Sequence, residues 1–114
     1  MLKNLSKREQ IIIDLLPAGH QKPITLKKLS YLAHMNQRGV RDIIYTLVVE
    51  RGLPVGSSTE PGAGGYFIIE DPEDLEVATR HLKPRAKKIF KRARALERIA
   101  WERFGQQLRL VFEK

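Results

Sequence analysis

The sequence contains no cysteine, and this absence removes several classes of chemistry at once. A chain without thiols has no disulfide framework, no cysteine nucleophile and no thiolate ligand for a metal. The absence fits a reducing compartment such as the cytosol. No apolar run reaches the roughly 18 residues of a membrane span, and the N-terminal MLKNLSKREQ lacks the apolar stretch of a secretory signal.

Catalytic and cofactor-binding motifs are also missing. The three histidines do not have the close spacing of a local metal site, and neither HExxH nor CxxC occurs. The chain contains no P-loop, no G-x-S-x-G and no G-x-G-x-x-G. Glu73, Asp74 and Glu76 are typical of charges in the first turn of a helix. We therefore expect no enzyme, no metal and no cofactor.

Acidic residues are scarce relative to basic ones. The 114 residues include 21 Lys and Arg against 13 Asp and Glu, which gives a formal net charge of +8. The hydrophobic fraction of 42% and the charged fraction of 30% are those of a globular chain. This length predicts one compact domain with at most an appendage. The charge predicts a polyanionic partner, with nucleic acid first and an anionic membrane surface second.

Capping residues mark the starts of three helices. Ser6 followed by Glu9 is the S-x-x-E capping box of a helix that should end at Leu16. Thr25 and Asn36 are good N-caps for a second and a third helix. Apolar residues at helical spacing follow each cap and predict the buried faces. These positions are Ile12, Ile13, Leu15, Leu16, Leu26, Leu29, Leu32, Ala33, Val40, Ile43, Ile44 and Leu47, with Val48 as a candidate extension of the last stripe.

Two short strand-like segments come next, at residues 53–57 and 66–69, with a Gly- and Pro-bearing loop between them. Ile24 is expected to form a strand of one or two residues. Asp71 begins a further helix, with a proline at its first position. The helical pattern then continues to the C-terminus, except that Pro84 predicts a kink or break just before it.

The order is helix, short strand, helix, turn, helix, strand, loop, strand. The segments LSKREQIIIDLLP, ITLKKLSYLAHMNQRGVRDIIYTL, ERGLPVGS and GGYFIIEDPEDL resemble small winged-helix proteins of phages and prophages. The resemblance covers about residues 5–76. It implies a winged helix-turn-helix and a location in the cytoplasm of a bacterial cell or of a phage-infected host. Together with the helical pattern that follows, we expect a mainly α fold with a small β-hairpin (α+β), in which the winged helix-turn-helix is followed by a long C-terminal helix kinked near Pro84. We expect a winged-helix domain over 1–71 and a basic helical extension over 72–114.

The third helix carries polar and cationic side chains ahead of its buried stripe. In a helix-turn-helix, the N-terminal residues of this helix reach base edges in the major groove. Gln37, Arg38 and Arg41 project from its first turn and a half, and Arg and Gln can grip guanine and adenine with two hydrogen bonds. Tyr45, one turn further on, is placed for a phosphate or a thymine methyl. The alternative is a solvated face with i, i+4 salt bridges.

Cations and hydroxyls elsewhere predict contacts with the DNA backbone, because the second helix of this motif crosses the phosphates. The wing, however, contains no Lys or Arg and includes the acidic Glu60. It is therefore either a minor DNA contact or a surface for protein contacts. The predicted phosphate contacts are Lys7, Arg8, Lys27, Lys28, Ser57, Ser58 and Thr59.

The C-terminal segment repeats apolar residues at alternating steps of four and three, which is a heptad seam. The seam consists of Leu82, Ala86, Ile89, Ala93, Leu96 and Ala100. It predicts a homodimer through this helix; the alternative is that the stripe folds back onto its own domain. From Arg80 to Arg98 only Glu97 opposes the cations, so this helix suits a DNA backbone or an acidic protein partner. A membrane surface is disfavoured because the apolar stripe is narrow and rich in alanine.

Two hypotheses follow from the sequence. The first is a sequence-specific protein that binds double-stranded DNA, as a dimeric bacterial or phage transcriptional regulator. The second is a winged-helix protein-interaction module, such as an accessory factor in phage DNA replication. The arginines of the third helix favour the first, and the wing without Lys or Arg favours the second.

Overall fold

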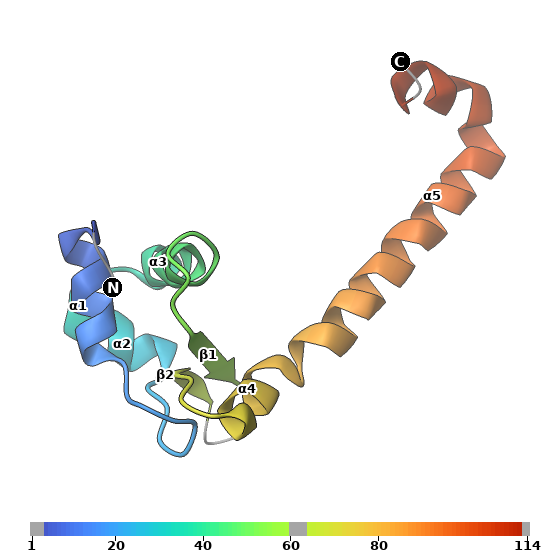
Figure 1. The fold of residues 1–114 in the computed structure, drawn as a ribbon. Helices are drawn as coiled ribbons and strands as arrows, with labels where there is room; N and C mark the ends of the chain where they lie inside the picture. The colour runs from blue at the N-terminus through green and yellow to red at the C-terminus, as the bar shows by residue number, and fades with distance from the viewer. Residues whose placement is uncertain (1–3, 60–63, 113–114) are drawn as a thin grey trace. The chain divides into compact units, whose positions relative to one another are not determined.

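The structure is a computed structural model that describes residues 4–59 and 64–112, with side chains described as far as residue 107. The elements are α1 (Lys7–Leu15), α2 (Leu26–Ala33), α3 (Gln37–Val49), β1 (Val55–Ser58), β2 (Gly65–Ile68), α4 (Pro72–Thr79) and α5 (Leu82–Phe112) (Figure 1). The chain divides into two compact units, Met1–His81 and Leu82–Lys114. The mainly α fold with one antiparallel hairpin confirms the fold class expected from the sequence.

The predicted caps begin the first three helices. Ser6 Oγ accepts a hydrogen bond from the Glu9 backbone N–H at 3.1 Å, while Glu9 Oε1 accepts one from the Ser6 N–H at 2.9 Å. This reciprocal pair satisfies two donors that α1 would otherwise leave unpaired. Thr25 and Asn36 likewise accept backbone N–H groups three residues further on, in α2 and α3. The sequence-based interpretation of all three caps is therefore confirmed.

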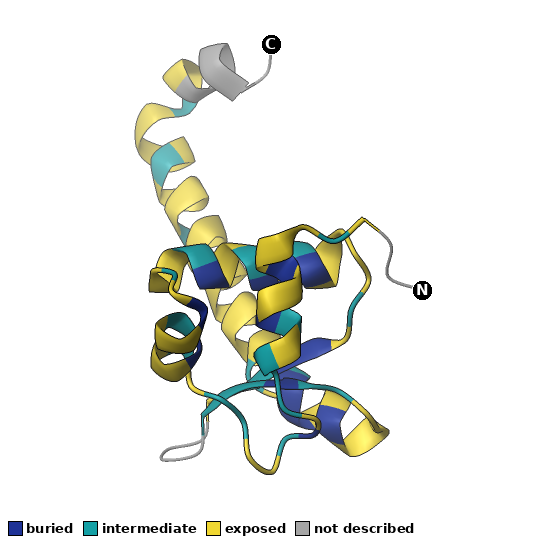
Figure 2. Ribbon diagram, turned by 90° about the vertical axis from the view of Figure 1, so that its left-hand side faces the viewer, coloured by how far each residue is buried: buried dark blue, intermediate teal, exposed yellow. Residues whose placement is uncertain are grey.

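The first hydrophobic core lies among α1, α2, α3 and the hairpin. Ile12, Leu29, Val40 and Leu47 are fully buried in it, and the buried stretches of these helices face inward (Figure 2). Two predicted core positions are wrong. Val48, the candidate extension of the α3 stripe, is 40% exposed, and Leu32 of α2 is 41% exposed. At about 100° per residue it lies some 120° around α2 from Leu26, at the edge of the buried face.

The hairpin pairs β1 with β2 in antiparallel register, from Val55 opposite Ile68 to Ser58 opposite Gly65. These strands begin and end within two residues of the predicted ones. Ile24 joins them as a single bridge to Tyr66, with N–O distances of 2.7 and 3.0 Å in the two directions. The expected one-residue strand is thus confirmed, and it ties the loop before α2 to the hairpin.

Helix α4 covers the other face of the hairpin and forms a second core with it. Phe67, Val77 and Ala78 are buried there. The helix approaches β1 so closely that a Cβ atom added to Gly56 would lie 2.7 Å from the Ala78 Cβ, which leaves room only for glycine. The first compact unit therefore extends to residue 81, ten residues beyond the boundary expected at 71.

The helical C-terminal region is interrupted twice. A turn at Arg80–His81 separates α4 from α5, which places the expected break just before Pro84. Pro84 itself lies in the first turn of α5, where a missing N–H costs no helical hydrogen bond. The second interruption, at Phe104 (φ −128°, ψ 27°), was not expected from the sequence. It immediately precedes Gly105, and glycine has low helix propensity.

A buried carboxylate joins α4 to the loop before α2. Asp74 Oδ1 accepts a hydrogen bond from the His20 backbone N–H at 3.1 Å and lies 2.5 Å from His20 Nδ1. Its Oδ2 accepts from the Glu70 N–H at 2.9 Å, and the side chain is only 2% exposed. The His20 ring also meets Phe67 edge-on, with 6.3 Å between ring centroids. This cluster holds together segments that are 54 residues apart in sequence.

The same pair shifts two pKa values in opposite directions. The hydrogen bond to Asp74 raises the pKa of His20 above its ordinary 6.5, against an opposing effect of burial. The hydrogen bond from His20 lowers the pKa of Asp74 below 3.8, and the Glu70 N–H adds to that effect.

Stability should therefore fall in two pH ranges. Because the pKa of His20 is raised in the folded state, its stabilisation is fully present below 6.5 and is lost as the pH rises through the raised pKa. Because the pKa of Asp74 is lowered, its stabilisation is present above 3.8 and is lost as the pH falls through the lowered pKa. Thermal denaturation across this range should show a decline in Tm above pH 6.5 that His20→Asn removes.

His34→Asn is the matched control for that measurement. His34 is exposed at the end of α2 with a left-handed φ of 56°, a conformation that asparagine also adopts. This variant should keep the decline in Tm of the unmodified protein. An equal decline in the unmodified protein and in His20→Asn would show that the pair makes no contribution.

Candidate nucleic-acid interface

Helix α3 has one buried face and one exposed polar face. Val40, Ile44 and Leu47 are buried in the first core, and this packing fixes the rotation of the helix about its axis. The predicted base-reading residues lie on the exposed side as a consequence. They are Gln37, Arg38, Arg41 and Tyr45, and all four are exposed.

The two arginines of this face have no acidic partner among the described residues. Asp42 lies four positions after Arg38 and is also exposed, yet no ion pair joins them in this part of the chain. Arg41 likewise forms no ion pair with any described carboxylate. Both guanidinium groups therefore keep their hydrogen-bond donors available to an external acceptor.

A third arginine, from α1, lies beside the start of α3. A Cβ atom added to Gly39 would be 3.5 Å from Arg8 Nη2 and 3.2 Å from the capping Asn36 Oδ1. The Arg8 guanidinium thus stands next to the first turn of α3. The positive end of the helix dipole is at the same place, so helix end and side chains together form a positively charged surface.

An ion pair helps to hold α1 in this position. Glu9 is buried and completes the capping box of α1, and its Oε1 lies 3.4 Å from Arg51 Nε, just beyond the end of α3. Lys7 and Arg8, in the same turn of α1 as Glu9, are exposed. Arg8, a predicted phosphate contact, is therefore held close to α3 although it belongs to α1.

Lys27 and Lys28 occupy the first turn of α2, directly after the Thr25 cap, and both are exposed. Within the described residues neither forms an ion pair. Their charges are therefore available to solvent and to an anionic ligand.

The hairpin presents less than the sequence predicted. Ser57 is half-buried and Ser58 is only 9% exposed, so the Ser58 hydroxyl has little access to a phosphate. Thr59 is exposed, and Glu60 lies outside the described residues. Of the three predicted phosphate contacts in the wing, Thr59 alone has an open position.

The sequence-based interpretation missed exposed apolar groups on α2 and α3. Tyr31 is 78% exposed on α2, and Val48 and Val49 are exposed at the end of α3. Their spacing contained the signal, because Tyr31 falls between the buried Leu29 and Ala33 and so points away from the core.

The predicted seam of α5 is open along its length. Leu82, Ile89 and Leu96 are 49%, 52% and 62% exposed. Ala86 and Ala93 are exposed as well, and Ala100 is half-buried. No residue from 82 to 107 is buried, and the ribbon of α5 is coloured as exposed or intermediate in Figure 2. A single copy of α5 therefore exposes a large apolar surface.

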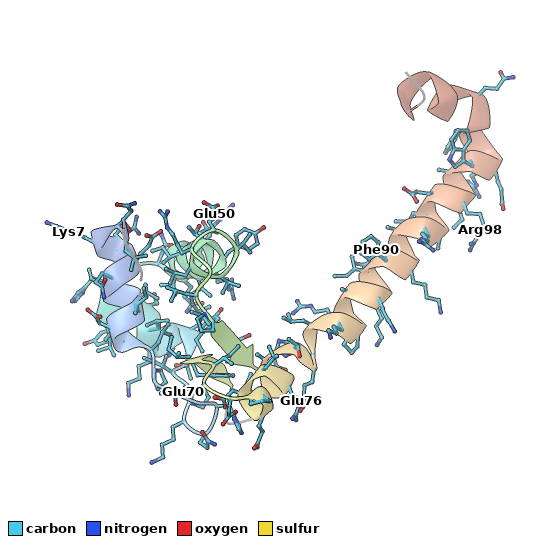
Figure 3. The ribbon with its side chains drawn as sticks, viewed as in Figure 1. Lys7, Glu50, Glu70, Glu76, Phe90 and Arg98 are labelled. Atoms are coloured by element: carbon cyan, nitrogen blue, oxygen red, sulfur yellow. The ribbon has the colours of Figure 1, made fainter. Side chains whose placement is uncertain are left out.

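Cations form a second stripe on the same helix. Phe90 and Arg98 extend outward from α5 (Figure 3). Phe90 lies in a shallow groove with Ala86, Ala95 and five basic side chains, whose spacing of three or four residues places them on one helical face. These are Lys83, Lys87, Lys91, Arg94 and Arg98.

No protein family model, curated protein or solved structure matches this chain. Among the helices of the described region, none is long and apolar enough to cross a membrane. Within residues 4–59 and 64–112, no three His, Asp or Glu side chains form a group that could hold a metal ion.

Proposed function

We propose that this chain binds double-stranded DNA with the first turns of α3 in the major groove, and that it acts as a dimeric bacterial or phage transcriptional regulator. The observation that carries the proposal is the exposed face of α3. Arg38 and Arg41 project there without acidic partners in the described region, and Arg8 lies beside the same turn. The net charge of +8 gives the whole chain attraction for a polyanion.

In this proposal, α3 reads the sequence. Arg38 and Arg41 each hold guanine O6 and N7 with two hydrogen bonds, and Gln37 pairs with adenine. Tyr45, one turn further along, contacts a phosphate or a thymine methyl. The buried stripe of Val40 and its neighbours fixes the angle at which these side chains meet the groove.

Four other cations position the protein without reading bases. Lys7 and Arg8 on α1 and Lys27 and Lys28 on α2 neutralise phosphates on either side of the groove. Thr59 adds a hydroxyl from the hairpin. The dimer forms through the α5 seam, and two-fold symmetry then presents two copies of α3 to two half-sites.

A protein-interaction module, such as an accessory factor in phage DNA replication, is the second candidate. Two observations favour it. The described residues of the hairpin and its loop, 55–59 and 64–68, include no Lys or Arg. Tyr31, Tyr45 and Val49 also expose apolar surface on α2 and α3, which suits a protein partner.

DNA affinity should fall steeply with salt, because each phosphate contact releases condensed counterions. Four contacts per chain predict a slope of about −3.6 for the logarithm of the binding constant against the logarithm of salt concentration, and about twice that for a dimer. Fluorescence anisotropy with a labelled duplex measures it. If no duplex binds at low salt, the DNA proposal fails and the interaction module takes its place.

Substitutions should separate reading from positioning. Arg38→Ala or Arg41→Ala should cost about 1–3 kcal/mol on a selected site and relax the preference at one base pair. Lys27→Ala should weaken selected and random duplexes alike. Lys22→Ala, which removes an exposed loop lysine with no proposed contact, is the control and should change neither. Equal losses on both duplexes for Arg38→Ala and Arg41→Ala would show that α3 does not read the sequence.

Charge placed in the seam should dissociate the dimer. Burying one Ile is worth about 1.5–3 kcal/mol, so Ile89→Asp in both chains should raise the dimer Kd at least about a hundredfold. Ala95→Asp makes the same charge change on the opposite side of α5 and should leave the Kd nearly unchanged. Sedimentation at several concentrations distinguishes these outcomes. An unmodified protein that is monomeric at tens of micromolar, with and without DNA, would contradict a seam dimer.

A further inference from the structure

The order of large and small residues along the exposed seam of α5 indicates how a partner helix would pack on it. Its large residues are Leu82, Ile89 and Leu96, and its small ones are the three alanines between and after them. We propose that α5 pairs antiparallel with α5 of a second copy, in a single register centred on Lys91. This inference rests on the proposed dimer and adds its orientation and register.

The antiparallel register gives every layer of the interface one large and one small side chain. In an antiparallel pair centred on Lys91, residues whose numbers are equally far from 91 lie at the same height. Leu82 then packs on Ala100 of the partner subunit, Leu96 on the partner's Ala86, and Ile89 on the partner's Ala93. Two-fold symmetry repeats these layers, so all six seam residues of each chain are covered.

A parallel pair in register would distribute the same side chains unevenly. Each residue would then face its own copy, and layers of two alanines would alternate with layers of two large aliphatics. Alanine layers require a small separation of the two helix axes, and leucine layers require a larger one. The separation cannot change that much between layers that are only a few ångströms apart along the axis. The alanine layers would leave cavities, which close-packed interfaces disfavour. Layer volume therefore selects the antiparallel orientation.

The side chains next to the seam are compatible with that register. In an antiparallel pair each flanking position faces the same position of the partner, with an offset of about two residues in height. Phe90 therefore lies next to Phe90 of the partner subunit. Lys83 faces the partner's Glu97, and this attraction occurs twice. The cost is Arg92 opposite its own copy at the centre. A parallel pair would also give Glu97 a cationic neighbour, the partner's Arg92, so the flanking charges permit both orientations and the layers decide.

The ends of the regular helix suit the same register. Pairing from Leu82 to Ala100 lies wholly between the turn at Arg80–His81 and the non-helical Phe104. Sliding the partner by one heptad in either direction would leave two seam residues of each chain uncovered. The register centred on Lys91 is thus the antiparallel one that buries the whole seam.

The lack of native cysteine makes a direct test possible, because any introduced thiol is the sole one in its chain. Leu82→Cys and Ala100→Cys are prepared separately, then mixed one to one in a glutathione redox buffer and run on a non-reducing gel. In the proposed register these two positions meet across the interface. Two copies of position 100 lie about 27 Å apart, since 18 residues at 1.5 Å each separate them along the axis.

The mixture should give a covalent dimer, whereas each variant alone should remain a single chain on the gel. Cross-linking of Ala100→Cys alone, to the same extent as the mixture, would establish a parallel pair and overturn the proposal. The absence of cross-linked dimer from all three samples would overturn it as well, because no pairing would then bring residues 82 and 100 together.

Charge exchange gives a second test that introduces no thiol. Glu97→Lys alone should weaken the dimer, and Lys83→Glu added to it should restore the dimer Kd to within about threefold of the unmodified protein. Arg92→Glu combined with Glu97→Lys has the same net charge but should leave the dimer weak. The opposite pattern, with rescue by Arg92→Glu, would identify a parallel pair.

Neither measurement uses DNA, so its outcome is separate from that of the proposed function. A chain that forms the cross-linked dimer but binds no duplex would keep this register and lose the regulator. A chain that binds duplexes as a monomer would keep the proposed DNA binding and lose this register.

Discussion

The burial of one face of α3 is the constraint on which the candidate site depends. Val40, Ile44 and Leu47 enter the first core, and the helix can satisfy that core in one rotation only. Every residue on the other face is then directed outward, whatever its chemistry. The exposure of Arg38 and Arg41 is therefore a consequence of apolar packing rather than of their own interactions. A core substitution that rotated α3 about its axis would redirect this face even if every polar residue stayed the same.

What could be predicted from the sequence was local. Capping needs residues three positions apart, so the Ser6–Glu9 box and the Asn36 cap were readable from the chain alone. The bond between His20 and Asp74 spans 54 residues, and no local pattern indicates it. The same holds for Arg8 beside Gly39, because their proximity follows from how α1 packs on α3. The residues on the exposed face of α3 could therefore be predicted from the sequence. The position of Arg8 at the edge of that face could not.

The extent of the first unit has the same origin. Asp71 and Pro72 indicate the start of a helix, which is why the boundary was expected there. Whether that helix stays with the hairpin or begins an extension depends on a non-local fit. Gly56 permits α4 to approach β1, and Asp74 is buried against His20. A glycine in a strand and an acid in a first turn each have many common explanations. Neither residue alone therefore predicts that α4 packs on the hairpin.

The exposed face of α3 and the seam of α5 differ in how they relate to the core. On α3 the core determines the exposed face, and the polar residues there need only be compatible with water. On α5 no described side chain is buried, so the spacing of Leu82, Ile89 and Leu96 has no counterpart within this helix. A stripe of three large and three small residues, alternating at steps of four and three, is the pattern of a helix–helix interface. Because the pattern is complementary to its own reverse, a second copy of the same helix is sufficient to cover it.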